Sequence, residues 1–119
     1  MSRRELTAAM ILAVDDVPAP TEVYVPEWGG VVYVRTLMGF ERDRFELAQS
    51  QLPEDARGEN FKARFCVYCV VDKDGAPLFE PGQAAELGRK SAGAVARIFD
   101  VAAPLNGLTE EHAKELAGN

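Results

Sequence analysis

The residues most capable of chemistry are Cys66 and Cys69, which form a CxxC pair. This spacing is typical of redox-active thiols and of half a zinc site. A redox pair needs the start of a helix, where the dipole lowers the thiol pKa, whereas these cysteines lie inside an apolar run that raises it. Zinc needs four ligands, and the chain adds only the distant His112. We expect two small buried side chains; a small CxxC metal or redox module is the alternative.

Two other segments resemble ligand-binding loops but have the wrong spacing. A phosphate-binding loop has four residues between its glycines and a lysine directly after the second, whereas residues 82–91 (GQAAELGRKS) have five residues there and Arg89 first. A calcium loop has glycine at its sixth position, whereas Gly75 is at the fourth position when Asp72 is counted as the first. We therefore expect a junction between two helices at 82–91 and a solvated turn at 72–75.

Acid–base catalysis has little support. The single histidine, His112, lies beside Glu110 and Glu111 in a charged segment, where we expect a surface position and no side chain paired with it. No serine nucleophile elbow, HExxH motif or paired-carboxylate motif occurs. Carboxylates distant in sequence can still converge, so an enzyme is the less favoured alternative. The prediction is a non-enzymatic protein with no catalytic residues, no metal and no cofactor.

Length and composition predict one ordinary globular domain over residues 1–119, with 47% hydrophobic and 27% charged residues. A formal charge of -6 and scattered basic residues argue against nucleic acid as a partner. No apolar stretch approaches the roughly 18 residues that a membrane span needs. The Arg3-Arg4 pair is followed by a short apolar run and Asp15-Asp16 without a cleavage site, so an export signal is not expected. We expect a cytoplasmic protein.

The elements that must position these residues can be read from periodicity. Leu6, Met10 and Ala13 share one face of a first helix over residues 3–14, which Pro18 and Pro20 prevent from continuing. Segments 21–25 and 31–35 are rich in strand-forming residues around a turn at 26–30, which predicts a β-hairpin. A second helix over 40–52 is expected to turn its apolar half towards a core. That half consists of Phe40, Phe45, Leu47, Ala48 and Leu52.

The second half of the chain reads as mainly helical. Asn60 can cap a third helix, and the apolar run 65–71 is compatible with helix or strand; we favour a buried helix. Pro81 suits the first turn of a helix that Gly88 ends. Ser91 can cap a helix that buries Val95, Ile98, Phe99 and Ala102, with Pro104 and Gly107 closing it, and Thr109 begins a last helix that ends near Gly118. The expected fold class is α+β, with an N-terminal helix and a β-hairpin packed with a mainly helical remainder.

A series of short segments recurs along the whole chain in a familiar order. They are Asp15-Asp16, VYVPEWGGVVYVR (23–35), GFERD (39–43), VDKDG (71–75), PLF (77–79), LG before KS (87–91), LNGLTEE (105–111) and ELAGN (115–119). No segment is specific alone, but as an ordered set they resemble the short tail assembly chaperones of long-tailed bacteriophages and prophages. Pro104 departs from the family pattern, in which the helix runs on towards the Leu-Asn-Gly turn.

The resemblance implies a protein that coats the long, largely helical tape measure protein, keeps it soluble and helps bring tail tube subunits to it. In the family a longer form arises by a programmed frameshift and contacts the tail tube protein, and this sequence resembles the short form. The resemblance places the protein in the host cytoplasm and outside the mature virion. Another phage morphogenesis adaptor, retained in the virion, is the alternative; self-association is plausible for a coating protein.

Trp28 is the one residue that the sequence singles out for partner binding. It lies at the expected hairpin tip, where Gly29 and Gly30 leave it little local cover. The hypothesis is that Trp28 is partly exposed and contacts the partner, and the alternative is an ordinary buried tryptophan.

Overall fold

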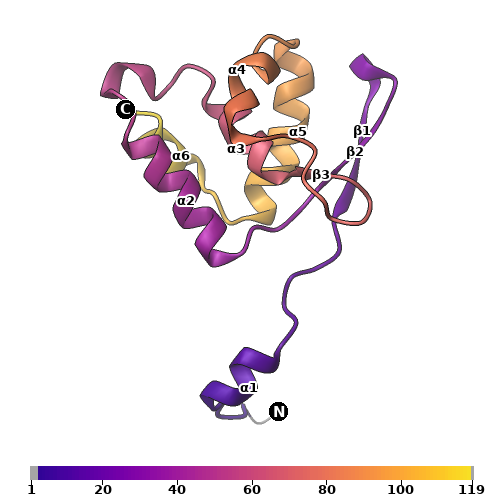
Figure 1. Ribbon diagram of the computed structural model, residues 1–119, viewed down its shortest axis with the longest axis vertical. Coiled ribbons are helices and arrows are strands. Elements are labelled where there is room, and N and C mark those ends of the chain that lie inside the picture. Colours follow the sequence, from indigo (N-terminus) through magenta and orange to yellow (C-terminus); the bar gives the residue numbers. More distant parts are fainter. Residues whose placement is uncertain (1–2, 119) are drawn as a thin grey trace.

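The computed structural model describes residues 3–118 and has the expected α+β class (Figure 1). Met1, Ser2 and Asn119, which belong to the predicted 1–119 domain, lie outside the described residues. Within the described part, six α-helices accompany a three-stranded antiparallel sheet, and a hairpin follows an N-terminal helix. The buried hydrophobic side chains gather in one core between the sheet and the helices.

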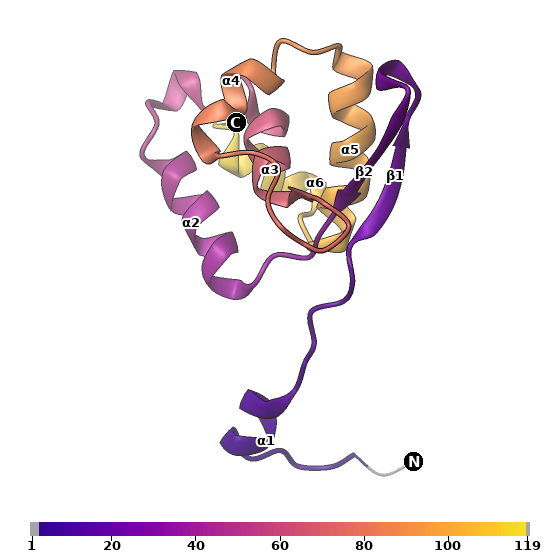
Figure 2. The same ribbon diagram turned by 45° about the vertical axis from the view of Figure 1, so that its right-hand side comes forward.

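The first helix, α1 (Ala8–Ala13), is shorter than the predicted 3–14 and stands apart from the rest (Figures 1 and 2). It begins where the Thr7 hydroxyl accepts a 3.2 Å hydrogen bond from the Met10 N–H, which leaves residues 3–6 outside the helix. None of its residues is buried, and the extended segment 14–20 connects it to the sheet. The radius of gyration of 15.8 Å accordingly exceeds the roughly 13.5 Å expected for a compact chain of this length. We call residues 3–17 the arm and residues 21–118 the body.

The predicted hairpin is confirmed, and it gains a third strand. β1 (Thr21–Val25) pairs antiparallel with β2 (Gly30–Val34) through one 3-10 turn at Pro26–Trp28, which ends at Gly29 with a φ of 70°. The positive φ is a conformation that glycine adopts without steric cost. β2 also pairs with β3 (Val70–Val71), so β2 is the central strand.

The apolar run 65–71, whose composition is compatible with helix or strand, contains the end of a helix and a short strand. α3 (Phe61–Cys69) makes residues 65–69 a buried helix as predicted, but the prediction is wrong for Val70 and Val71. These two β-branched residues pair with Val34 and Tyr33, because the free edge of β2 supplies partners for their backbone groups. The expected side-chain cap at Asn60 is also wrong, since Asn60 has a φ of 62° and its side chain accepts no capping bond.

The longest helix, α5 (Ala92–Leu105), begins as predicted, with the Ser91 hydroxyl accepting a bond from the Ala94 N–H. Val95, Ile98 and Ala102 are buried and Phe99 is partly buried against the core. Pro104 does not end the helix, contrary to the prediction. It lies exposed in the last turn, where its missing N–H leaves one exposed carbonyl free for water.

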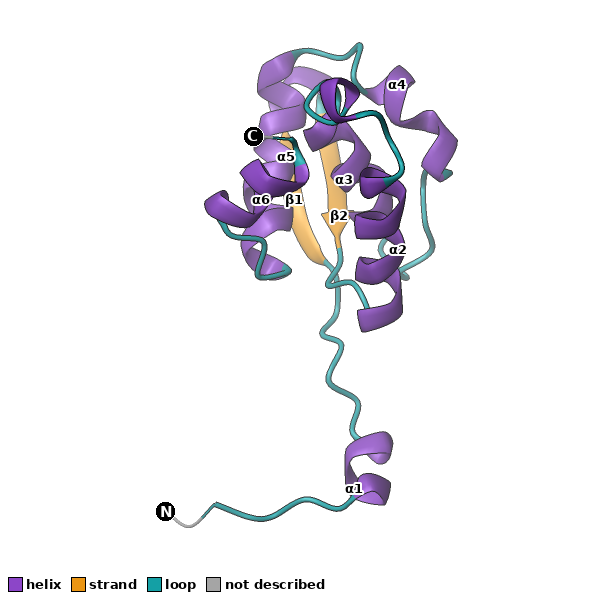
Figure 3. Cartoon of the chain, turned by 90° about the vertical axis from the view of Figure 1, so that its left-hand side faces the viewer, coloured by secondary structure: helices purple, strands orange, loops and turns teal. Residues whose placement is uncertain are grey.

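Two short helices flank α5 in the chain order of the body (Figure 3). α4 (Ala84–Leu87) follows a 3-10 turn at Pro81–Gln83 and ends at Gly88, as predicted. A Cβ at Gly88 would collide with the Asn60 side-chain oxygen, so glycine allows the two segments to meet. α6 (Glu110–Leu116) begins with Thr109, whose hydroxyl accepts from the His112 N–H.

The helix α2 (Gly39–Ser50) turns a different face inward from the one predicted. Phe45 is buried as expected, but its buried neighbour is Gln49, whereas Phe40, Leu47 and Ala48 are exposed. The reason is a buried polar network. The Gln49 side chain donates to the carbonyls of Arg57 and Leu116 at 2.6 and 2.9 Å and accepts from Arg64 Nε at 2.9 Å. These bonds connect α2 to α3 and to the end of α6.

Candidate protein-binding surfaces

The CxxC pair lies in the last turn of α3, and both thiols are free and fully buried. Burial raises the pKa of the Cys66 thiol far above its ordinary value and that of Cys69 to about 12. Asn106 Nδ2 lies 3.8 Å from Cys69 Sγ, and Cys66 Sγ lies 4.0 Å from the Val95 carbonyl. A reactive thiol needs exposure and a lowered pKa, and these thiols have neither. They fill space in the core, as the sequence predicted.

The two loop-like motifs have the predicted local structures. Residues 82–91 join α4 to α5, with Gly88 between them. The 72–75 turn is held by Asp72, whose carboxylate accepts from the backbone N–H groups of Asp74 and Ala76 at 2.8 and 3.0 Å. Among residues 3–118, no three His, Cys, Asp or Glu side chains lie close enough together to share a metal ion.

His112 has carboxylate neighbours that the sequence did not predict. Its Nε2 lies 3.4 Å from a carboxylate oxygen of Glu46 on α2, and its Nδ1 lies 3.5 Å from one of Glu115. The same Glu46 carboxylate accepts a 2.9 Å hydrogen bond from Arg42. The expectation of an unpartnered histidine was therefore wrong, and the contacts tie α6 to α2 at the surface.

Trp28 lies at the hairpin tip and is 38% exposed, as the hypothesis required. It borders a small hollow of about 380 Å³ that Phe79 and Leu87 also line. The neighbouring Glu27 carboxylate accepts two 3.1 Å hydrogen bonds from Arg97 of α5, which hold the tip against the body. The tip therefore presents a large aromatic side chain from a fixed position.

The outer face of α2 carries a second apolar surface, which we call the α2 face and define by Met38, Phe40 and Leu47. Phe40 and Leu47 are 53% and 59% exposed, and Met38 is exposed at the helix start. The Arg44 guanidinium lies over the Phe40 ring at 4.9 Å, which covers only one side of it. Sequence reasoning assigned Phe40 and Leu47 to the core. The signal it missed is Gln49, whose position opposite them fixes the buried face.

The hairpin presents a third apolar surface on the side away from the core. Tyr24 and Val31 are cross-strand partners, and Tyr24 is 61% exposed. Alternation along the strands places Val23 and Val25 on the opposite, buried face. β1 has one paired neighbour, β2, and lies at the edge of the sheet.

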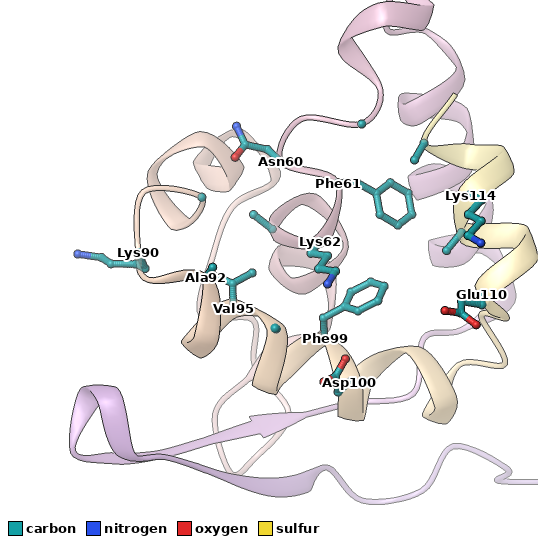
Figure 4. A pocket seen from close by; sticks show the side chains of 16 residues that line it. Asn60, Phe61, Lys62, Lys90, Ala92, Val95, Phe99, Asp100, Glu110 and Lys114 are labelled. Carbon is teal, nitrogen blue, oxygen red and sulfur yellow. The ribbon is translucent and has the colours of Figure 1, made fainter. Parts of the chain in front are cut away.

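An open groove of about 690 Å³ lies between α3, α5 and α6 (Figure 4). Its floor consists of buried Phe61 and Val95 and of partly buried Phe99, over whose ring the Lys62 ammonium lies at 5.5 Å. Alanines line it from three helices, and they are Ala63, Ala92, Ala96, Ala113 and Ala117. Small side chains let another backbone approach closely, so the groove has the size and lining of a site for an apolar segment. Lys90 lies at one end and Glu110 with Lys114 at the other.

Comparison of the chain with protein-family models, with curated proteins and with solved structures finds no match in any of the three. None of the helices in residues 3–118 has the length and apolar character needed to cross a bilayer.

Proposed function

We propose that this protein acts by binding another protein chain, and that it is a tail assembly chaperone of a long-tailed bacteriophage or prophage. The observation that carries protein binding is the set of large apolar side chains left exposed on a folded body, at the hairpin tip, the α2 face and the open side of the sheet. Exposed apolar patches on a soluble body mark interaction sites, and aromatic anchors contribute most of their binding energy.

The choice of partner rests on the resemblance of the ordered segments along the chain. On that basis the partner is the tape measure protein, which the chaperone keeps soluble in the host cytoplasm while tail tube subunits arrive through a longer, frameshifted form. The chaperone leaves before the virion matures. The role requires neither catalysis nor a cofactor. An amphipathic helix is the expected ligand, because it offers apolar side chains at a spacing that such patches can receive.

Co-expression with the neighbouring tape measure protein tests this function. We expect the tape measure protein to become soluble and to co-purify with the wild-type chain. Trp28→Ala and the double variant Phe40→Ala/Leu47→Ala are expected to lower its soluble yield, whereas Asp43→Ala, an exposed polar change on α2, leaves it unchanged. Unchanged solubility and binding with both apolar variants, each folded by circular dichroism, would discard these surfaces. A tape measure protein that stays insoluble with the wild-type chain would refute the proposal.

Mass spectrometry of purified virions separates the chaperone from a morphogenesis adaptor. A chaperone is absent from the particles, and stoichiometric recovery of the chain would favour the adaptor.

A further inference from the structure

The arm cannot be explained by the fold of its own body. Residues 8–14 (AAMILAV) are apolar on every side of the helix, and Leu12 is 86% exposed while Leu6, Ile11 and Val14 are about half exposed. A helix that is apolar all round belongs in a buried setting. Six residues are also too few for a helix to be stable in water without tertiary contacts. The arm therefore needs a surface that covers it.

The groove between α3, α5 and α6 is complementary to the arm in shape and in apolar character. Its alanine walls allow a helix backbone to approach closely. The Phe99 ring on its floor is partly exposed, with the Lys62 ammonium over it at 5.5 Å, and Phe61 lies buried beside it. The arm itself is rich in alanine beside its Met, Ile and Leu side chains. Small residues on both sides permit the close approach that leaves few voids.

The charges of the arm and the groove are also complementary. The arm carries Arg3 and Arg4 against Glu5, Asp15 and Asp16, a net charge of 2 − 3 = −1. The groove is bordered by three lysines and two carboxylates, a net charge of 3 − 2 = +1, although the whole chain carries -6. These groove residues are Lys62, Lys90, Lys114, Asp100 and Glu110.

The order of these charges defines a direction. The basic end of the arm precedes α1 and the acidic end follows it, while the groove has Lys90 at one end and Glu110 beside Lys114 at the other (Figure 4). An arm laid with Asp15-Asp16 near Lys90 places Arg3-Arg4 near Glu110. The opposite direction would bring the acidic pair to the end where Glu110 offsets Lys114, which attracts it less than Lys90 alone does.

The linker directs the arm away from its own body. Pro18 and Pro20 restrict Val17 and Ala19 to extended backbone, and the segment 14–20 runs outward from the start of β1. We propose that the arm docks into the groove of a second copy of the chain, with Ile11 and Leu12 on its apolar floor. This contact between arm and groove joins copies of the chain to one another. It does not depend on which partner binds the hairpin tip or the α2 face.

Light scattering on the purified full chain tests the contact first. The wild type is expected to form an assembly larger than a monomer that dissociates on dilution. Ile11→Asp/Leu12→Asp is expected to be monomeric and to keep its fold, because α1 buries nothing in its own body. Leu47→Asp on the α2 face is the matched control and leaves the assembly unchanged. A wild type that is monomeric at all concentrations, or an assembly that only Leu47→Asp disrupts, would overturn the proposal.

Disulfide trapping distinguishes a second copy from the chain's own groove. Leu12→Cys and Ala96→Cys proteins are prepared separately, mixed and oxidised, and a disulfide between the two different chains is expected. The native thiols are buried and do not compete. If the mixture gives no such disulfide, and a chain carrying both Leu12→Cys and Ala96→Cys forms the disulfide within itself, the arm folds back on its own body and the proposal is wrong.

Charge reversal tests the direction of the arm in the groove. Lys90→Glu is expected to weaken the assembly, and adding Asp15→Lys/Asp16→Lys on the arm is expected to restore it.

Discussion

Phe65 in the body and Leu12 in the arm are both large apolar side chains, yet Phe65 is fully buried and Leu12 is 86% exposed. Phe65 packs edge-on against Phe45 and Phe99, with ring centroids 5.0 and 5.8 Å apart. Leu12 has no comparable neighbours, because α1 buries no residue. This difference separates the apolar residues whose presence is explained by folding from those whose presence is not. The core accounts for the buried apolar residues of the body, whereas it does not account for the exposed ones of the arm and the α2 face, for which we propose contacts with other chains.

The largest difference in stability between the two regions is expected for a pair of alanine substitutions. Phe65→Ala removes a ring from the centre of the aromatic cluster and is expected to lower the free energy of unfolding by about 3 to 5 kcal/mol. Leu12→Ala is expected to change it by less than about 0.5 kcal/mol at concentrations where the chain is monomeric. Urea unfolding followed by circular dichroism measures both. Equal losses for the two variants would show that the arm packs on its own body.

Thiol labelling sharpens the comparison by reporting exposure residue by residue. Native Cys66 and Cys69 are expected to react with iodoacetamide at pH 8 at least about a hundredfold more slowly than in urea, because burial removes access and thiolate together. At concentrations where the chain is monomeric, a cysteine placed in the arm by Leu12→Cys is expected to react at the rate of an unfolded peptide. Rapid labelling of the native pair would revive the redox alternative.

Gln49 tests whether the body depends on its buried polar bonds as well as on its apolar core. Gln49→Leu leaves Arg64 Nε and the Leu116 carbonyl without the Gln49 bonds they have in the native fold, and the Arg57 carbonyl keeps only its bond from Arg64 Nη2. The expected loss of unfolding free energy is about 1 to 3 kcal/mol. Gln51→Leu, an exposed change at the C-cap of the same helix, is the control and should have little effect. A neutral Gln49→Leu would mean that another feature fixes the face of α2.

The smallest expected effect is a pH response at the hairpin tip. The hydrogen bonds from Arg97 hold the pKa of Glu27 below its ordinary value of 4.5. A lowered folded-state pKa means that the stabilising contribution is present above pH 4.5 and is lost as pH falls through the folded value. Fluorescence of Trp28, the single tryptophan, should change over this acid range and lose that step in Arg97→Gln. A step that persists in Arg97→Gln belongs to another group.

Much of the fold could be predicted from the sequence, because short-range features of the chain determine most of its helices and strands. The hairpin, the Ser91 cap and the buried stripe of α5 all follow from strand propensity, capping and helical period. Val70 and Val71 could not be assigned, because their strand exists only where β2 offers a free edge. Pro104 stays helical because its lost bond falls in an exposed last turn.

The candidate surfaces were harder to predict than the elements. Trp28 was placed correctly, because adjacent glycines leave a turn residue little cover. The α2 face was missed, because an amphipathic pattern shows which side of a helix is apolar but not whether that side packs against the core. The hydrogen bonds of Gln49, which fix the buried side, form only between segments distant in sequence. The groove was missed for a similar reason. Its alanines at i and i+4, along α5 and at the end of α6, resemble ordinary helix formers until the two helices are placed together.

The most direct test of the central claim, that the exposed apolar side chains exist to bind protein, is hydrogen exchange of the full chain with and without purified tape measure protein. We predict slower exchange at the hairpin tip and along α2 on adding the partner, with α3 and the buried side of α5 unchanged. A complex that forms without slowing exchange at either surface, or a chain whose exchange is the same with and without the partner, would contradict the account.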